Sequence, residues 1–198
     1  MTASYPGYDV LAKWDSPSFD DKTRKVLDAR LRTPPARRFF SEEEWRLMEA
    51  LADRLLPQPD RADPVPIVAM LDEQLFFDRG EGFRHEDMPR QQQAWRAGLA
   101  AIDAEARLRF GAPFAALDLA RQDGLLQDIA NNAVNHRLWE AIPAERFFIH
   151  FLLKGAAGVY YSHPSAWSEI GFGGPASPRG YVRLGFNGRD PWDAREEK

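Results

Sequence analysis

The sequence predicts an all-α fold, an irregular helix bundle with an extended N-terminal arm and an extended C-terminal tail. Apolar residues recur at three- and four-residue steps from about residue 19 to about residue 162, which is the period of amphipathic helices. No segment has the apolar–polar alternation of a strand. The helical pattern stops outside this range. We therefore divide the chain into an arm over residues 1–18, a bundle over 19–162 and a tail over 163–198.

The composition allows one stable domain and argues against several classes of function. The chain has 198 residues, of which 44% are hydrophobic, and a chain of this length can bury roughly 70% of its unfolded surface. The net charge is −4, with acidic and basic residues mixed along the sequence, so neither a nucleic acid nor an anionic membrane is an expected partner. Cysteine is absent, which removes disulfides, thiolate catalysis and iron–sulfur ligation.

The first two helices in the bundle have recognisable starting signals. Ser41 and Glu44 form a capping box, and Pro57 ends the helix that follows. The Asp-Pro pair at 63–64 has the pattern of an N-cap and a first helical turn. It predicts a second helix that continues to the break at Gly80.

Two further helices are predicted from their ends. The longest apolar pattern runs from Met88 to Phe110 and stops at Gly111, with Pro113 beyond it. Asp118 is then placed to cap a shorter helix.

Residues 145–161, ERFFIHFLLKGAAGVYY, are the most apolar segment of the chain. They are apolar nearly all round, which is typical of the central, buried helix of a bundle. The run is too short for a membrane span, and His150, Lys154, Gly155 and Gly158 interrupt it. We expect no direct insertion into a membrane.

The N-terminal region carries no predicted export signal. Residues 1–20 lack a basic segment followed by an apolar one. Arg37 and Arg38 resemble a twin-arginine motif, but the charged stretch SEEEWRLMEALADR follows where an apolar run should stand. We interpret the two arginines as surface residues ahead of a helix.

Residues that could perform chemistry are sparse, and we expect no catalytic, cofactor-binding or metal-binding residues in this chain. None of the four histidines is spaced from a second ligand as helical metal sites require. The GFGGP stretch follows a helix and lacks the Lys-Ser/Thr pair of a phosphate loop. No serine lies in a G-x-S-x-G context.

The tail segment AWSEIGFGGPASPRGY, residues 166–181, has the composition of a binding surface. Its glycines allow unusual turns or the close approach of another chain, its prolines stiffen it, and Trp, Tyr and Arg are enriched where interfaces bind tightly. The alternative is that its aromatic rings only pack the tail onto its own bundle. The residues that we predict to bind a partner are Trp167, Ile170, Phe172, Pro175, Arg179, Tyr181 and Trp192.

Two segments resemble the gluconate 2-dehydrogenase subunit 3 family over about residues 39–192. The more specific is W-x-x-I-G-F-x-G-P followed by R-G-Y, and the other is FSEEEWRLMEALADRLLPQPD with its A-D-x-x-x-P element. In this sequence the matching positions are Trp167, Ile170, Gly171, Phe172, Gly174, Pro175, Arg179, Gly180 and Tyr181 in the tail, and Ala52, Asp53 and Pro57 upstream.

The resemblance implies a small, non-catalytic subunit of an FAD-dependent sugar or polyol dehydrogenase. In such complexes a large flavoprotein of the glucose-methanol-choline (GMC) class carries the flavin and the catalytic histidine, and a cytochrome c subunit can accept the electrons. The small subunit is thought to support folding of the flavoprotein and to carry it across the inner membrane on its own twin-arginine signal.

This sequence departs from the family pattern in lacking that signal. We therefore expect a subunit that works in the cytoplasm, or one that reaches the periplasm by co-export with its partner. The alternative function is an independent helical enzyme or ligand-binding protein with a pocket around residues 145–161, lined by His150, Lys154 and Tyr160.

Overall fold

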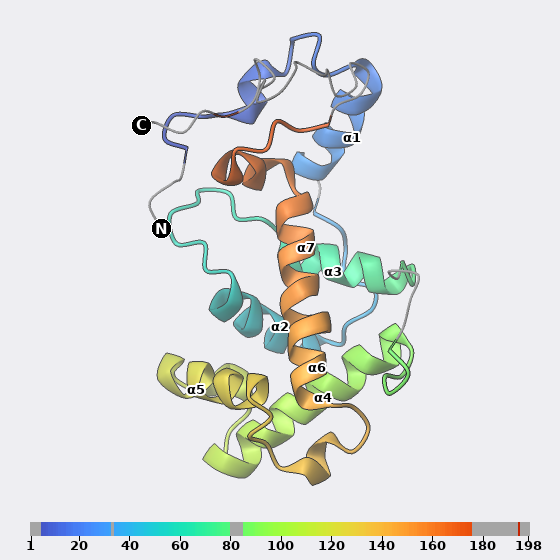
Figure 1. Cartoon of the computed structure of the whole chain (residues 1–198), viewed down its shortest axis with the longest axis vertical. Coiled ribbons are helices and arrows are strands. Elements are labelled where there is room, and N and C mark those ends of the chain that lie inside the picture. Colours follow the sequence, from blue (N-terminus) through green and yellow to red (C-terminus); the bar gives the residue numbers. More distant parts are fainter. Residues whose placement is uncertain (1–4, 33, 80–84, 176–193, 195–198) are drawn as a thin grey trace, which may run out of the picture. The chain divides into compact units, whose positions relative to one another are not determined.

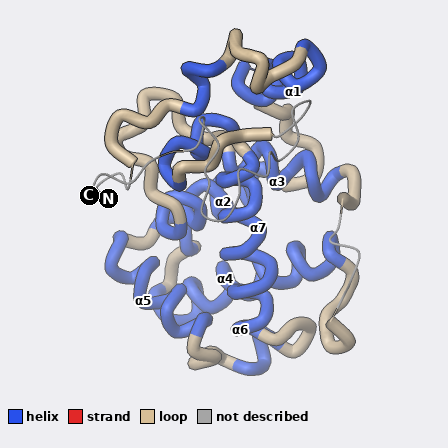
Figure 2. Tube along the Cα trace, turned by 45° about the horizontal axis from the view of Figure 1, so that its top comes forward, coloured by secondary structure: helices blue, strands red, loops and turns tan. Residues whose placement is uncertain are grey.

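The computed structural model, shown in Figure 1, describes residues 5–32, 34–79, 85–175 and 194 and confirms the all-α fold class. The described residues form helices joined by loops and contain no strand (Figure 2). They belong to two compact units. One is Pro35–Val159, and the other combines Met1–Pro34 with Tyr160–Lys198, so that the two ends of the chain contribute to one unit.

The larger unit, Pro35–Val159, is built around α2. This helix contacts the next three helices along the chain, and the segment that leads into the last helix packs against two of them. The elements are α2 (Glu42–Leu55), α3 (Ile67–Phe76), α4 (Gln91–Phe110), η2 (Phe114–Ala116), α5 (Leu119–Ala130), η3 (His136–Trp139), α6 (Ala144–Arg146), η4 (Phe147–Leu153) and the first part of α7 (Lys154–Ser162).

Three predicted helix ends are confirmed by their hydrogen bonds. The Ser41 side chain accepts from the Glu44 backbone N–H while the Glu44 carboxylate accepts from the Ser41 N–H, which completes the capping box of α2. Asp118 caps α5 by accepting from the Arg121 N–H. Gly111 ends α4 in the left-handed conformation, with φ of 73°.

The starts of α3 and α4 were predicted wrongly, and proline explains both errors. The second helix begins at Ile67 rather than after Asp63, and the long helix begins at Gln91 rather than at Met88. A residue that precedes proline is disfavoured in the helical conformation. Val65 precedes Pro66 and Met88 precedes Pro89, so the helical conformation is disfavoured at Val65 and at Met88.

The apolar segment 145–161 is helical but not buried all round, contrary to the prediction. It consists of the end of α6, the π-helix η4 and most of α7. Phe147 and Leu152 are fully buried. Ile149 and Leu153 are 40% and 37% exposed, and the intervening His150 is exposed as well. The segment therefore presents one face to the core and one to solvent.

The smaller unit contains one short helix in the predicted arm, η1 (Val10–Lys13), and one in the predicted tail, η5 (Pro164–Ile170), although the sequence indicated both segments as extended. It also contains α1 (Asp21–Arg32), from the part of the chain predicted to be helical, and η5 contacts both η1 and α1. Asp20 accepts a hydrogen bond from the Thr23 N–H at 2.7 Å, in the position of an N-cap for α1. This bond lowers the pKa of the Asp20 carboxyl.

Candidate partner-binding site

Trp167, the first of the predicted binding residues, is the centre of a small hydrophobic core. Its side chain is 4% exposed and packs with Val10, Phe19 and Leu27. We call these four residues the Trp167 cluster. The Trp167 indole N–H donates to the Tyr161 carbonyl at 2.8 Å, so its polar atom is satisfied although it is buried. Three partly buried residues, Tyr8, Leu11 and Trp14, pack around the cluster.

Two glycines of the tail motif adopt a left-handed conformation that shapes the chain around Trp167. Gly171 ends η5 with φ of 66°, and Gly174 has φ of 75°. A Cβ at Gly174 would lie 3.2 Å from the Phe19 ring and 3.3 Å from the Trp167 ring. Gly171 and Gly174 therefore set the backbone conformation of this segment, and Gly174 also allows close packing.

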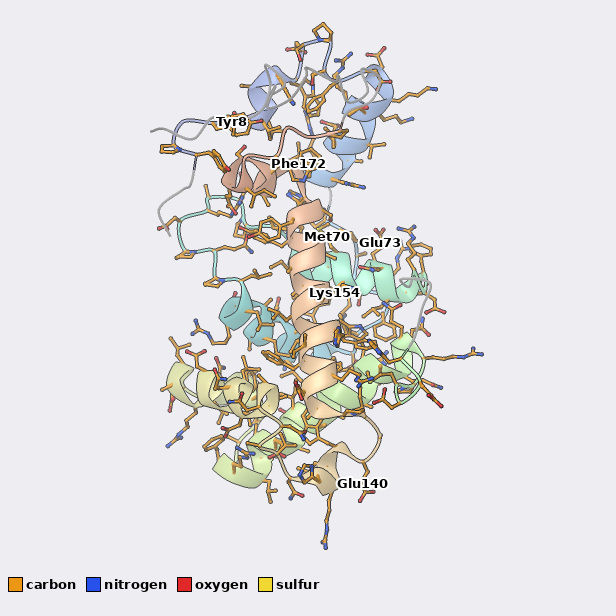
Figure 3. All side chains as sticks on the ribbon, viewed as in Figure 1. Tyr8, Met70, Glu73, Glu140, Lys154 and Phe172 are labelled. Atoms are coloured by element: carbon orange, nitrogen blue, oxygen red, sulfur yellow. The ribbon has the colours of Figure 1, made fainter. Side chains whose placement is uncertain are left out.

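Ile170 and Phe172 lie on either side of Gly171 and remain accessible. Ile170 is 47% exposed and Phe172 is 38% exposed. The Phe172 ring stands edge-on against Trp167, with centroids 5.3 Å apart and planes at 89°, and the Phe172 N–H donates to the Trp167 carbonyl at 3.0 Å. Figure 3 labels Phe172 in the segment that follows η5. A buried ring and a backbone bond thus fix an exposed ring in place.

The remaining predicted binding residues divide between the described and the undescribed parts of the chain. Pro175 is described and is partly buried. Arg179, Tyr181 and Trp192 lie outside the described residues. A role in partner binding stays a prediction for all seven residues.

Long-range polar contacts attach the tail to the arm. The Val10 N–H donates to the Ser168 hydroxyl at 3.0 Å, and the Lys13 ammonium donates to the Gly173 carbonyl. The imidazole of His163 lies 3.0 Å from the Arg30 carbonyl through Nε2. These bonds tie η1 and α1 to both ends of η5, so the residues that present Phe172 form one structure with the N-terminal region.

The N-terminal arm belongs to this site although none of its residues was predicted to bind a partner. The sequence of the arm contains Tyr5, Tyr8 and Trp14, and such rings need a surface to cover. Phe19 and Val10, which contact Trp167 in the cluster, are each 1% exposed. In the sequence, the indication that the arm takes part in the site is its aromatic residues without a helical pattern. Such residues do not indicate which surface their rings cover.

The residues of the alternative pocket do not share one environment. His150 and Lys154 are exposed, and the His150 ring lies 5.0 Å from the ring of His85. Tyr160 is buried and its hydroxyl donates to the Glu169 carboxylate at 2.8 Å. Among the described residues, no group of three or more His, Asp or Glu side chains is arranged to hold a metal ion.

The described helices also include none that combines the length and the apolar character needed to cross a membrane. The longest of them, α4, has polar and charged residues throughout its 20 residues.

Comparison with known proteins identifies one family. The family model described as gluconate 2-dehydrogenase subunit 3 matches residues 42–174, about two thirds of the chain. The match begins at Glu42, the first residue of α2, and reaches Gly174 at its other end. No curated protein and no solved structure matches the chain significantly.

Proposed function

Because this chain belongs to the gluconate 2-dehydrogenase subunit 3 family, we propose that it is a non-catalytic accessory subunit that binds and stabilises an FAD-dependent dehydrogenase of the GMC class. The partner oxidises a sugar, a polyol or a glycoside, and it holds both the FAD and the catalytic residues. The chain acts in the compartment of this partner, either the cytoplasm or, by co-export, the periplasm.

One observation supports this proposal most directly. Ile170 and Phe172 are exposed apolar side chains on a backbone that left-handed glycines and the buried Trp167 hold in a fixed shape. Pre-organised apolar groups bind with a smaller loss of conformational freedom than mobile ones. The same residues lie in the part of the chain that matches the family.

The proposal is tested with the double variant Ile170→Ser and Phe172→Ser. We expect it to reduce recovery of the chain with a tagged form of the proposed flavoprotein partner by about tenfold or more, because substitution of central apolar anchors has such effects in other interfaces. The matched control is Leu108→Ser with Leu119→Ser, which alters two leucines that are 60% and 63% exposed in the larger unit. Undiminished recovery of the tail variant would show that these residues are not anchors.

A cytochrome c subunit is the second proposed partner. Haem absorbance in the purified complex would support its presence, whereas a complex that contains only the flavoprotein and this chain would exclude it from the stable assembly.

A further inference from the structure

A pair of adjacent phenylalanines at the end of α3 is unusually exposed. Phe76 and Phe77 are each 45% exposed, and their rings meet edge-on with centroids 5.1 Å apart. Single exposed apolar side chains are common on protein surfaces. Two large aromatic rings in contact with each other and with solvent are more informative, because such patches often mark sites of interaction.

Two guanidinium groups lie over these rings. Arg38 is 5.5 Å from the Phe76 centroid and 5.8 Å from the Phe77 centroid, and Arg79 is 4.6 Å from the Phe77 centroid. We call Arg38, Phe76, Phe77 and Arg79 the Arg–Phe patch. All four side chains belong to the larger unit and all are exposed.

The positive charge of the Arg–Phe patch is incompletely neutralised. In the described part of the chain, no carboxylate forms an ion pair with Arg38, whose guanidinium contacts only the two rings. Arg79 has Glu73 at 4.0 Å, the outer limit of an ion pair. Asp78 is a further acidic residue close in sequence to the patch. Arg38 is therefore an exposed cation that is available to a carboxylate.

The Arg–Phe patch is held in place by a buried carboxylate. Asp72, in α3, is fully buried and accepts hydrogen bonds from the backbone N–H groups of Arg38, Phe39 and Phe40 at 2.6, 3.0 and 2.7 Å. Three bonds to one carboxylate fix this segment against α3, because leaving the fully buried Asp72 carboxylate without these partners would be costly. Phe76 lies one turn after Asp72 in α3. The bonds to Asp72 therefore hold Arg38 beside Phe76.

We propose that the Arg–Phe patch docks an acidic, partly apolar segment of the dehydrogenase subunit. Carboxylates of that segment pair with Arg38 and Arg79, whose planar guanidinium groups suit bidentate binding, and its apolar side chains cover Phe76 and Phe77. An unpaired cation on a surface that is already ordered favours a partner segment of complementary, acidic charge. This inference rests on the proposed function, since it assigns a second contact to the same partner.

The test compares three variants in co-expression with the tagged flavoprotein. Arg38→Gln removes the unpaired charge, and Phe76→Ala with Phe77→Ala removes the rings. The matched control is Phe110→Ala with Arg121→Ala. Phe110 is 38% exposed and the Arg121 guanidinium lies 5.7 Å from its ring, so the control removes a similar Arg–Phe pair elsewhere in the larger unit.

We expect the phenylalanine variant to lower recovery of the chain about tenfold or more. Arg38→Gln should weaken recovery at low salt and make it less sensitive to added salt, because one interfacial charge pair is missing. The control should be recovered like the wild type. Circular dichroism of each purified chain verifies folding. If the double variant unfolds, Arg38→Gln still tests the patch, because glutamine keeps the backbone N–H that donates to Asp72.

The outcomes separate this inference from the proposed function. If the wild-type chain is not recovered with the flavoprotein, the proposed function fails and the inference fails with it. If the wild type is recovered and the patch variants are recovered equally well, only the inference is overturned. Equal weakening by the Phe110 control also overturns it. If the wild-type chain alone self-associates and the patch variants abolish that association, the occupant is a second copy and the inference is wrong.

Discussion

Glycine at position 174 is required both by the backbone and by the surrounding side chains. Gly7 and Gly174 have nearly the same φ, 74° and 75°, and both lie in the smaller unit. A Cβ at Gly7 would meet nothing within 4 Å, whereas a Cβ at Gly174 would crowd Phe19 and Trp167 at 3.2–3.3 Å. The two positions therefore share the conformational strain that alanine would introduce and differ only in packing.

We expect Gly7→Ala to lower the free energy of unfolding by about 1 kcal/mol, the strain of a left-handed residue that carries a Cβ. Gly174→Ala should lower it by about 1–3 kcal/mol more, because the crowded rings belong to a buried core. Urea unfolding followed by tryptophan fluorescence measures both. Equal losses at the two positions would mean that the Trp167 cluster is not packed around Gly174.

At the scale of elements, the fit between α4 and η4 depends on another glycine. A Cβ at Gly98 would come within 2.3–2.5 Å of the Phe147 ring. That ring is fully buried and is held by Trp95 and Phe151, with centroids at 5.7 and 6.1 Å. Phe147 has little room to move away, so α4 could accommodate a side chain at position 98 only by shifting.

Gly98→Ala should therefore destabilise the larger unit by about 2–3 kcal/mol, the effect of overpacking a core. Gly124→Ala in α5 is the matched control, because a Cβ there meets nothing within 4 Å. Alanine at this exposed helical position should stabilise the protein by about 0.5–1 kcal/mol. Thermal unfolding measures the stability of both variants. A Gly98→Ala variant as stable as the wild type would contradict the close packing of α4 against Phe147.

Elements whose determinants are local could be predicted from the sequence. Ser41, Asp118 and Gly111 act on backbone groups within a few residues, so their capping roles follow from spacing alone. The starts of α3 and α4 could also have been predicted, because the restriction that proline imposes on its preceding residue is local. Periodicity was less reliable for residues 145–161, because Ile149 and Leu153 are apolar and yet exposed.

The candidate site could be predicted only in part, for a physical reason. The tail motif is visible in the sequence, but the contacts of Trp167 with Val10 and Phe19 join residues about 150 positions apart, which no local pattern encodes. The same holds for the Arg–Phe patch. Asp72 brings Arg38 beside α3 through hydrogen bonds across more than 30 residues, and the sequence shows only an unremarkable FFDR at 76–79.

At the scale of the whole molecule, family membership and the exposed groups point to a chain that functions within a complex. The smaller unit contributes Ile170 and Phe172, and the larger unit contributes the Arg–Phe patch. Each unit therefore has its own candidate contact, and the two sets of variants test them separately. A protein with two such surfaces should be more stable and more soluble with its partner than without it.

The most direct test of the central claim is to express the chain with and without its proposed flavoprotein partner. Size-exclusion mass and absorbance at the flavin band are then recorded for each sample. We expect a yellow heterocomplex from co-expression, and we expect the flavoprotein expressed alone to lose its flavin or its solubility. A colourless monomer that stays separate from a fully active, flavin-loaded partner would contradict the proposal that this chain is its accessory subunit.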